Sequence, residues 1–237
     1  MGKVRRRNDD LEIIFEDKWL IVVNKPSGLL SMSTGKGGED TAYSRLFDYA
    51  GRVFIVHRLD KDTSGLLVFA KDQDTKLALQ ENWEDAVIER RYTAILEGEI
   101  SDQEGWIESW LYECSKSMKV YCYEMGVDAK PENPPRKDWQ YASTHCRTIK
   151  HIEIEGLPYT VVEFNLETGR KNQIRVHSQW IGHPIAGDRK YGAQTNPLGR
   201  LALHSNVLSF IHPWTGKTMK FTSPIPRIFK TKGSIQL

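Results

Sequence analysis

The chain has 237 residues, of which 39% are hydrophobic and 27% are charged, and its formal net charge at pH 7 is +2. This length suits one large domain or two small ones with a substantial core, and the composition is that of a soluble globular protein. A net charge so near zero excludes a polycation, so a nucleic-acid partner must be bound by a local basic patch.

The cysteines and the amino terminus indicate the compartment. Cys114, Cys122 and Cys146 are odd in number and lack CxxC spacing, which favours reduced thiols over a disulfide framework. No apolar run approaches the roughly 18 residues of a membrane span, and acidic residues interrupt the amino terminus, which argues against a signal peptide. We therefore expect a cytoplasmic protein.

The local sequence pattern predicts the helices and strands of the first half of the chain. Residues 11–28 predict two short strands that end at Lys25-Pro26-Ser27-Gly28. The Gly-rich stretch after them lacks the spacing of a P-loop and predicts a loop before a helix at 41–49. A buried strand at 65–71, a helix at 75–85 and a strand at 90–100 follow.

The second half begins with an insertion, residues 101–147, in which the three prolines of 126–138 predict an exposed loop. A strand at 159–169 leads to a helix that starts after Gly169 and ends at Gly182, and short β-like pieces fill the last third.

This order of elements favours an α+β fold, because strands dominate and no regular βαβ alternation is present. We expect a single catalytic domain on a mostly antiparallel mixed sheet, with a central cleft and a few flanking helices. The domain would span residues 11–230, between a basic N-terminal tail at 1–10 and a C-terminal tail at 231–237.

Three polar clusters stand out: His57-Arg58-Leu59-Asp60, Arg90-Arg91-Tyr92, and residues 167–177. Together they supply a carboxylate, several guanidiniums and a phenol, a suitable set for an acid, base or nucleophile beside a phosphate-bearing ligand. The helix expected after Gly169 would carry Lys171 and Arg175 on one face and direct free amides toward an anion.

Taken singly, these residues have ordinary explanations. Asp60 could cap a turn, Tyr92 could pack across strands, and Arg170 and Arg175 could form surface ion pairs. A metal site is not expected, because the histidines lack the i, i+4 spacing of ligands on one helix face and no cysteine is suitably spaced.

Five sequence motifs that follow one another along the chain favour a catalytic role over these ordinary explanations. The stretch "VHRLDKDTSGLLVFAKD" resembles the signature of the RluA-type pseudouridine synthases, and "NKPSGLLS", "RRYTAILEG", "LETGRKNQIRVH" and the closing "GDRKYGA…LALHSNVLSFIHPWTGK" resemble further blocks of that family. The resemblance implies an isomerase that turns uridine in RNA into pseudouridine after base flipping. The implied reaction requires no metal, redox cofactor or ATP.

The resemblance also implies residue roles. Asp60 matches the catalytic aspartate, Tyr92 the tyrosine against the target uracil, and Arg175 the basic residue that pairs with the carboxylate. Arg58 matches the arginine that fills the gap left by the flipped base, and Ile174 the apolar residue that touches the base. The other residues expected to bind substrate are His57, Arg170, Lys171 and Gln173.

One departure from the family pattern is Lys171-Asn172, which stands where many members have Thr or Ser followed by His. It puts in doubt an RNA contact carried over from that histidine. The expected partner is RNA, and we expect large-subunit ribosomal RNA in preference to transfer RNA. The protein is expected to act as a monomer, without a metal ion and without a membrane. Specificity would reside in the 101–147 insertion and in the basic run at 3–7.

Two other functions remain open on sequence alone. A glycoside hydrolase using Asp60 would need a second carboxylate, and Asp62, Glu167 and Asp188 are the candidates. A non-catalytic RNA-binding or ribosome-assembly module would have kept the fold, but the intact Asp60, Tyr92 and Arg175 argue against it.

Overall fold

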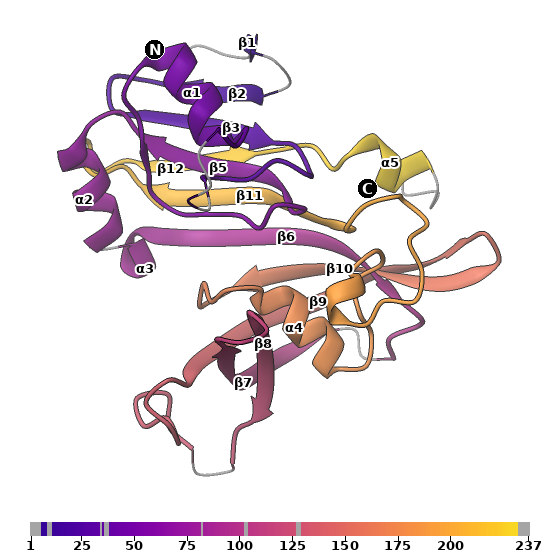
Figure 1. Ribbon diagram of the computed structural model, residues 1–237. Helices are drawn as coiled ribbons and strands as arrows, with labels where there is room; N and C mark the ends of the chain where they lie inside the picture. The colour runs from indigo at the N-terminus through magenta and orange to yellow at the C-terminus, as the bar shows by residue number, and fades with distance from the viewer. Residues whose placement is uncertain are drawn as a thin grey trace. The chain divides into compact units, whose positions relative to one another are not determined.

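The computed structural model describes residues 6–8, 11–33, 35, 38–81, 83–101, 104–126 and 129–231 (Figure 1). Contacts divide the chain into two compact units. The first consists of Met1–Arg90 with His204–Pro224, and the second of Arg91–Leu203 with Ile225–Leu237. Each unit is described by itself.

The first unit is built on strands β1 (Arg6–Asn8), β2 (Leu11–Glu16), β3 (Leu20–Lys25), β5 (Ser64–Ala70) and β11 (Leu203–Ile211), which neighbour one another in that order. Strand β4 (Phe54–Ile55) pairs with β5, and β12 (Thr218–Thr222) pairs with β11. All these pairs are antiparallel except β5 with β11, which is parallel. The pairing of β1 shows that part of the segment expected as a tail belongs to the sheet.

Strand β5 forms the middle of this unit because its sequence, SGLLVFA, is apolar after Ser64 and every residue in it is buried. At its start, Gly65 has φ +119°, and a Cβ there would lie 2.1 Å from the Ser205 carbonyl oxygen. Only glycine permits this close approach of backbones. The Thr63-Ser64-Gly65 sequence therefore directs the chain out of the polar loop and into the sheet.

Helices of the first unit are α1 (Ala42–Ala50), α2 (Gln73–Glu81) and the short α3 (Trp83–Ala86). Helix α1 begins with a reciprocal cap, in which Thr41 Oγ1 accepts from the Ser44 amide and Ser44 Oγ accepts from the Thr41 amide. The helix predicted at 75–85 corresponds to α2 and α3, whose described residues lie on either side of position 82.

The second unit contains an antiparallel sheet in the order β6 (Val87–Glu97), β10 (Leu157–Leu166), β9 (Gln140–Ile154), β7 (Glu104–Cys114) and β8 (Lys119–Glu124). Of β6, the part from Arg91 onward belongs to this unit. Helix α4 (Gln173–Trp180) packs near β8 and β9. A 3-10 turn η1 (Arg189–Tyr191) and the terminal α5 (Arg227–Thr231) complete the unit.

The start of α4 differs from the sequence prediction. The helix begins at Gln173 rather than after Gly169, because Asn172 adopts the left-handed conformation with φ +55° and forms a separate turn with the residues before it. Lys171 therefore lies outside the helix and does not share its face with Arg175.

The α+β class with a mostly antiparallel mixed sheet is confirmed. Most described residues of 126–138 are exposed and outside helices and strands, as the prolines predicted. The cysteines, Cys114, Cys122 and Cys146, are free. Among the described residues, no helix has the length and apolar character needed to cross a membrane.

Candidate active site

The polar loop between β4 and β5 carries Asp60 in the first unit. Its Leu59 is a buried anchor, Arg58 is exposed, and Asp60 is partly exposed. The Thr63 amide donates to the Asp60 carbonyl oxygen at 3.2 Å, which closes a turn. The loop thus presents a carboxylate and a guanidinium from a backbone held by an apolar residue between them.

The segment after β3 clamps this loop from one side. Ser31 Oγ donates to the Leu59 carbonyl at 2.7 Å and accepts from the Leu59 amide at 3.1 Å. Lys25, which is fully buried, donates from Nζ to the Lys61 carbonyl at 2.9 Å, and the Gly28 amide donates to the same oxygen at 3.0 Å. Ser27 Oγ donates to the Asp62 carbonyl at 2.6 Å.

This clamp gives the "NKPSGLLS" block a physical role that its sequence did not reveal. Lys25 Nζ also donates to the carbonyls of Pro26 and Leu29, at 3.0 and 2.7 Å, so its buried charge is solvated by backbone oxygens. The residues on either side of Asp60 therefore have little freedom to move.

We predict that Ser31→Ala destabilises the protein by roughly 1–3 kcal/mol, because it leaves the Leu59 amide and carbonyl without their buried partner. Turnover should fall as the loop loosens. Urea unfolding and single-turnover rates measure both effects. Ser33→Ala is the matched control, since Ser33 bonds Glu39 at an exposed position. Equal stability of the two variants would contradict the clamp.

His57 is partly buried in the first unit. Its ring stacks on Trp83, with centroids 4.9 Å apart, and Nε2 accepts from the Val68 amide at 3.2 Å. Burial, with a smaller contribution from the Arg90 charge, lowers the pKa of His57 to about 3. The imidazole is therefore neutral at physiological pH, and the structure gives it the role of anchoring the loop to β5.

Tyr92 lies on β6 in the second unit, directly opposite Phe164 on β10. It is partly buried and packs against the core cluster that contains Phe164 and Ile174. Ile174, 4% exposed, is thereby part of the same apolar group as the tyrosine. Tyr92 and Ile174, the two residues predicted to contact the base, therefore belong to the same apolar cluster.

Arg175, in the first turn of α4, is bound by Asp188. Its Nε donates to Oδ2 at 2.7 Å and its Nη2 donates to Oδ1 at 2.8 Å, which is a two-bond fork. The Arg175 side chain is 12% exposed and that of Asp188 is 1% exposed. The sequence offers Asp188 only as a second carboxylate for a hydrolase, whereas the structure pairs it with Arg175.

The other predicted binding residues of this segment make intramolecular contacts. Gln173 is 2% exposed; its Nε2 donates to the Ser143 carbonyl and its Oε1 accepts from the Arg170 amide. Arg170 Nε donates to the Tyr141 carbonyl at 3.1 Å. Lys171 forms an ion pair with Glu113. Gln173 thus holds the turn before α4, and the RNA contacts expected of these residues stay predictions.

His177, fully buried on α4, makes the stability of the protein depend on pH. Its ring nitrogens bond Ser109 and Thr144, both at 2.9 Å, and burial lowers its pKa to about 4 from 6.5. A folded-state pKa below the unfolded value means that the unfolded chain takes up the proton first. We therefore expect this group to remove about 3 kcal/mol of stability as pH falls from 6.5 to about 4, and none above 6.5.

Chemical unfolding of the wild type and of His177→Gln at several pH values measures this dependence. The glutamine keeps hydrogen-bonding groups but cannot titrate, so its stability should fall less steeply over that interval. Identical slopes would contradict the assignment.

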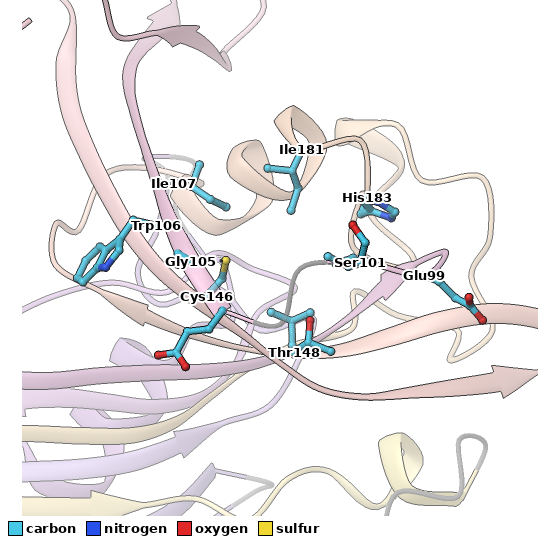
Figure 2. A pocket seen from close by; sticks show the side chains of 12 residues that line it. Glu99, Ser101, Gly105, Trp106, Ile107, Cys146, Thr148, Ile181 and His183 are labelled. Carbon is cyan, nitrogen blue, oxygen red and sulfur yellow. Dashed lines mark hydrogen bonds between the residues drawn. The ribbon is translucent and has the colours of Figure 1, made fainter. Parts of the chain in front are cut away.

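A separate cavity of about 290 Å³ lies in the second unit, lined by apolar side chains such as Ile107 and Ile181 together with Glu99, Ser101 and His183 (Figure 2). It shares no residue with the predicted site. No group of three or more His, Cys, Asp or Glu side chains within the described ranges is arranged to hold a metal ion.

Comparison with known proteins identifies the class to which this geometry belongs. Residues 19–180 match the family model described as RNA pseudouridylate synthase. The match includes the Asp60 loop, Tyr92 and Arg175. The chain belongs to this family, in its RluA-type branch, and is therefore an isomerase that converts uridine in RNA to pseudouridine.

Individual relatives agree with this assignment. "Ribosomal large subunit pseudouridine synthase D" of Zymomonas mobilis subsp. mobilis is 36% identical over 236 residues, covering 92% of this chain and 70% of the relative. "Dual-specificity RNA pseudouridine synthase RluA" of Vibrio vulnificus is 37% identical over 209 residues, covering 85% and 78%.

Among solved structures, human RNA Pseudouridylate Synthase Domain Containing 1 has a similar fold, with a TM-score of 0.73 at 23% identity. The similarity covers 90% of this chain and 83% of that one, so it extends over both units and supports the single-domain expectation.

Proposed function

We propose that this chain isomerises specific uridines of large-subunit ribosomal RNA and that Asp60 is its catalytic carboxylate. The observation that carries the proposal is the clamped loop: Ser31, Lys25 and Gly28 fix the backbone on both sides of a partly exposed aspartate. A reactive group must be held within a fraction of an ångström to act efficiently. A turn residue without function would not need this support.

The reaction breaks the N1–C1′ bond, rotates the base and joins C5 to C1′, with no net loss of atoms. Asp60 would act as the nucleophile at C1′, as a base at the sugar, or by attack at C6. Tyr92, beside an apolar cluster, suits stacking on the uracil and is the candidate base for the C5 proton. Arg175 is the candidate for supplying positive charge to the reacting groups of the substrate.

The target base must leave its stack before it can react, which costs a few kcal/mol. Exposed Arg58 is available to fill the gap, and the aromatic ring of Tyr92 would offset part of that cost. This explains why an arginine and an aspartate occupy one short loop.

The choice of RNA rests on the relatives. One relative of 36% identity is named for the ribosomal large subunit, which supports ribosomal RNA. A second candidate, the same reaction on transfer RNA, is favoured by the relative of 37% identity that is named as dual-specific.

Pseudouridine mapping of total RNA from cells with and without the gene tests the choice directly. Loss of sites in large-subunit ribosomal RNA alone supports the proposal, and loss in transfer RNA alone would overturn it. Tritium release from C5-labelled RNA by the purified protein measures the reaction itself, and release of free uracil would indicate hydrolysis instead.

A further inference from the structure

Asp188 has a rigidly fixed backbone. Its amide donates to the Ile185 carbonyl at 2.9 Å, and its own carbonyl accepts from the amides of Tyr191 and Ala193 at 3.0 and 3.1 Å. Before it, Gly187 has φ +83°, and a Cβ there would lie 2.3 Å from the Arg200 carbonyl oxygen. The carboxylate is therefore presented from a turn that cannot shift easily.

Two further side chains surround the guanidinium that Asp188 binds. The ring of Tyr191, fully buried, lies 5.0 Å from the Arg175 Cζ. Asn172 Oδ1 accepts from Arg175 Nη1 at 3.2 Å, and Asn172 Nδ2 donates to the Tyr191 hydroxyl at 2.9 Å. The left-handed turn at Asn172 places that amide between the two.

These contacts hold the arginine in one orientation. The carboxylate fixes the plane of the guanidinium through two parallel bonds, because the fork of an arginine matches the two oxygens of an aspartate. Resting on the proposed function, we propose that Asp188 is a positioning residue, which holds Arg175 in its catalytically competent orientation and so sets kcat rather than RNA affinity.

A purely structural role for Asp188 is the alternative, since it also belongs to the segment at 187–200. Glu97 supplies the matched control. Its carboxylate accepts from the amides of Gln194 and Thr195 at 3.1 and 2.6 Å, so it holds the same segment without touching Arg175. Glu97→Gln weakens the segment and leaves the fork intact.

The experiment compares kcat and KM for tritium release, together with unfolding, in Asp188→Asn, Glu97→Gln, Arg175→Ala and the double variant of positions 175 and 188. For Asp188→Asn we expect a loss in kcat on the order of 10²-fold with KM within about twofold. Glu97→Gln should keep kcat within about twofold. Asn172→Gly, which suits the left-handed turn and removes the third acceptor, should lower kcat by a smaller factor.

The double variant separates the two roles. Adding Asp188→Asn to Arg175→Ala removes the unpaired buried carboxylate, so stability should recover while kcat stays at the level of Arg175→Ala. The proposal is overturned if Asp188→Asn keeps wild-type kcat or if Glu97→Gln lowers kcat as much as Asp188→Asn does. It is also overturned if the losses in kcat of Asp188→Asn and Arg175→Ala multiply in the double variant. Wild-type kcat in Arg175→Ala would instead refute the catalytic role of Arg175.

Discussion

Asp60→Asn is expected to abolish pseudouridine formation, with a loss in turnover of at least about 10³-fold, because a carboxamide can act neither as the nucleophile nor as the base of the reaction. The loop backbone is held by other residues, so the variant should stay folded. RNA affinity should stay near that of the wild type.

Single-turnover tritium release and filter binding measure these quantities. Asp62→Asn is the control, because Asp62 is an exposed carboxylate of the same loop and its anchoring bond to Ser27 uses the backbone carbonyl. Substantial activity in Asp60→Asn, or an equal loss in Asp62→Asn, would remove Asp60 from the mechanism.

Arg175→Ala has the second largest expected effect: a fall in kcat of about 10²–10³-fold with a much smaller loss of RNA affinity, since the positive charge would act on the reacting groups rather than on phosphates. The variant also leaves the buried carboxylate of Asp188 without its partner, which should cost about 3–5 kcal/mol of stability. Arg175→Lys keeps the charge but cannot form the two-bond fork with Asp188. Its kcat should therefore stay below that of the wild type, while its stability should exceed that of Arg175→Ala.

Steady-state kinetics and the salt dependence of binding distinguish the two possible roles. If Arg175→Ala weakens binding to every RNA equally and reduces the salt slope by about one, Arg175 is a phosphate contact. Arg147→Ala serves as the matched control, because Arg147 is a more exposed arginine of the second unit that pairs with Glu163.

The β-rich fold class could be predicted because the spacing of apolar and polar residues is visible in the sequence without any knowledge of tertiary contacts. The apolar run of β5, the turn at Lys25-Pro26-Ser27-Gly28 and the proline-rich loop each carry a local signal, and the structure agrees with all three. The start of α4 could not be predicted, because the left-handed Asn172 is stabilised by Tyr191, which lies 19 positions along the chain.

The order of the motifs along the chain was enough to identify the family. The same motifs predict Asp60, Tyr92 and Arg175 as the site residues. Tertiary structure alone decided which residues support them. Ser31 and Leu59 are 28 positions apart, and Arg175 and Asp188 are 13 apart. Such pairs bond only once the chain has folded, because no local spacing rule brings a serine to a distant backbone or an aspartate to a guanidinium in another element.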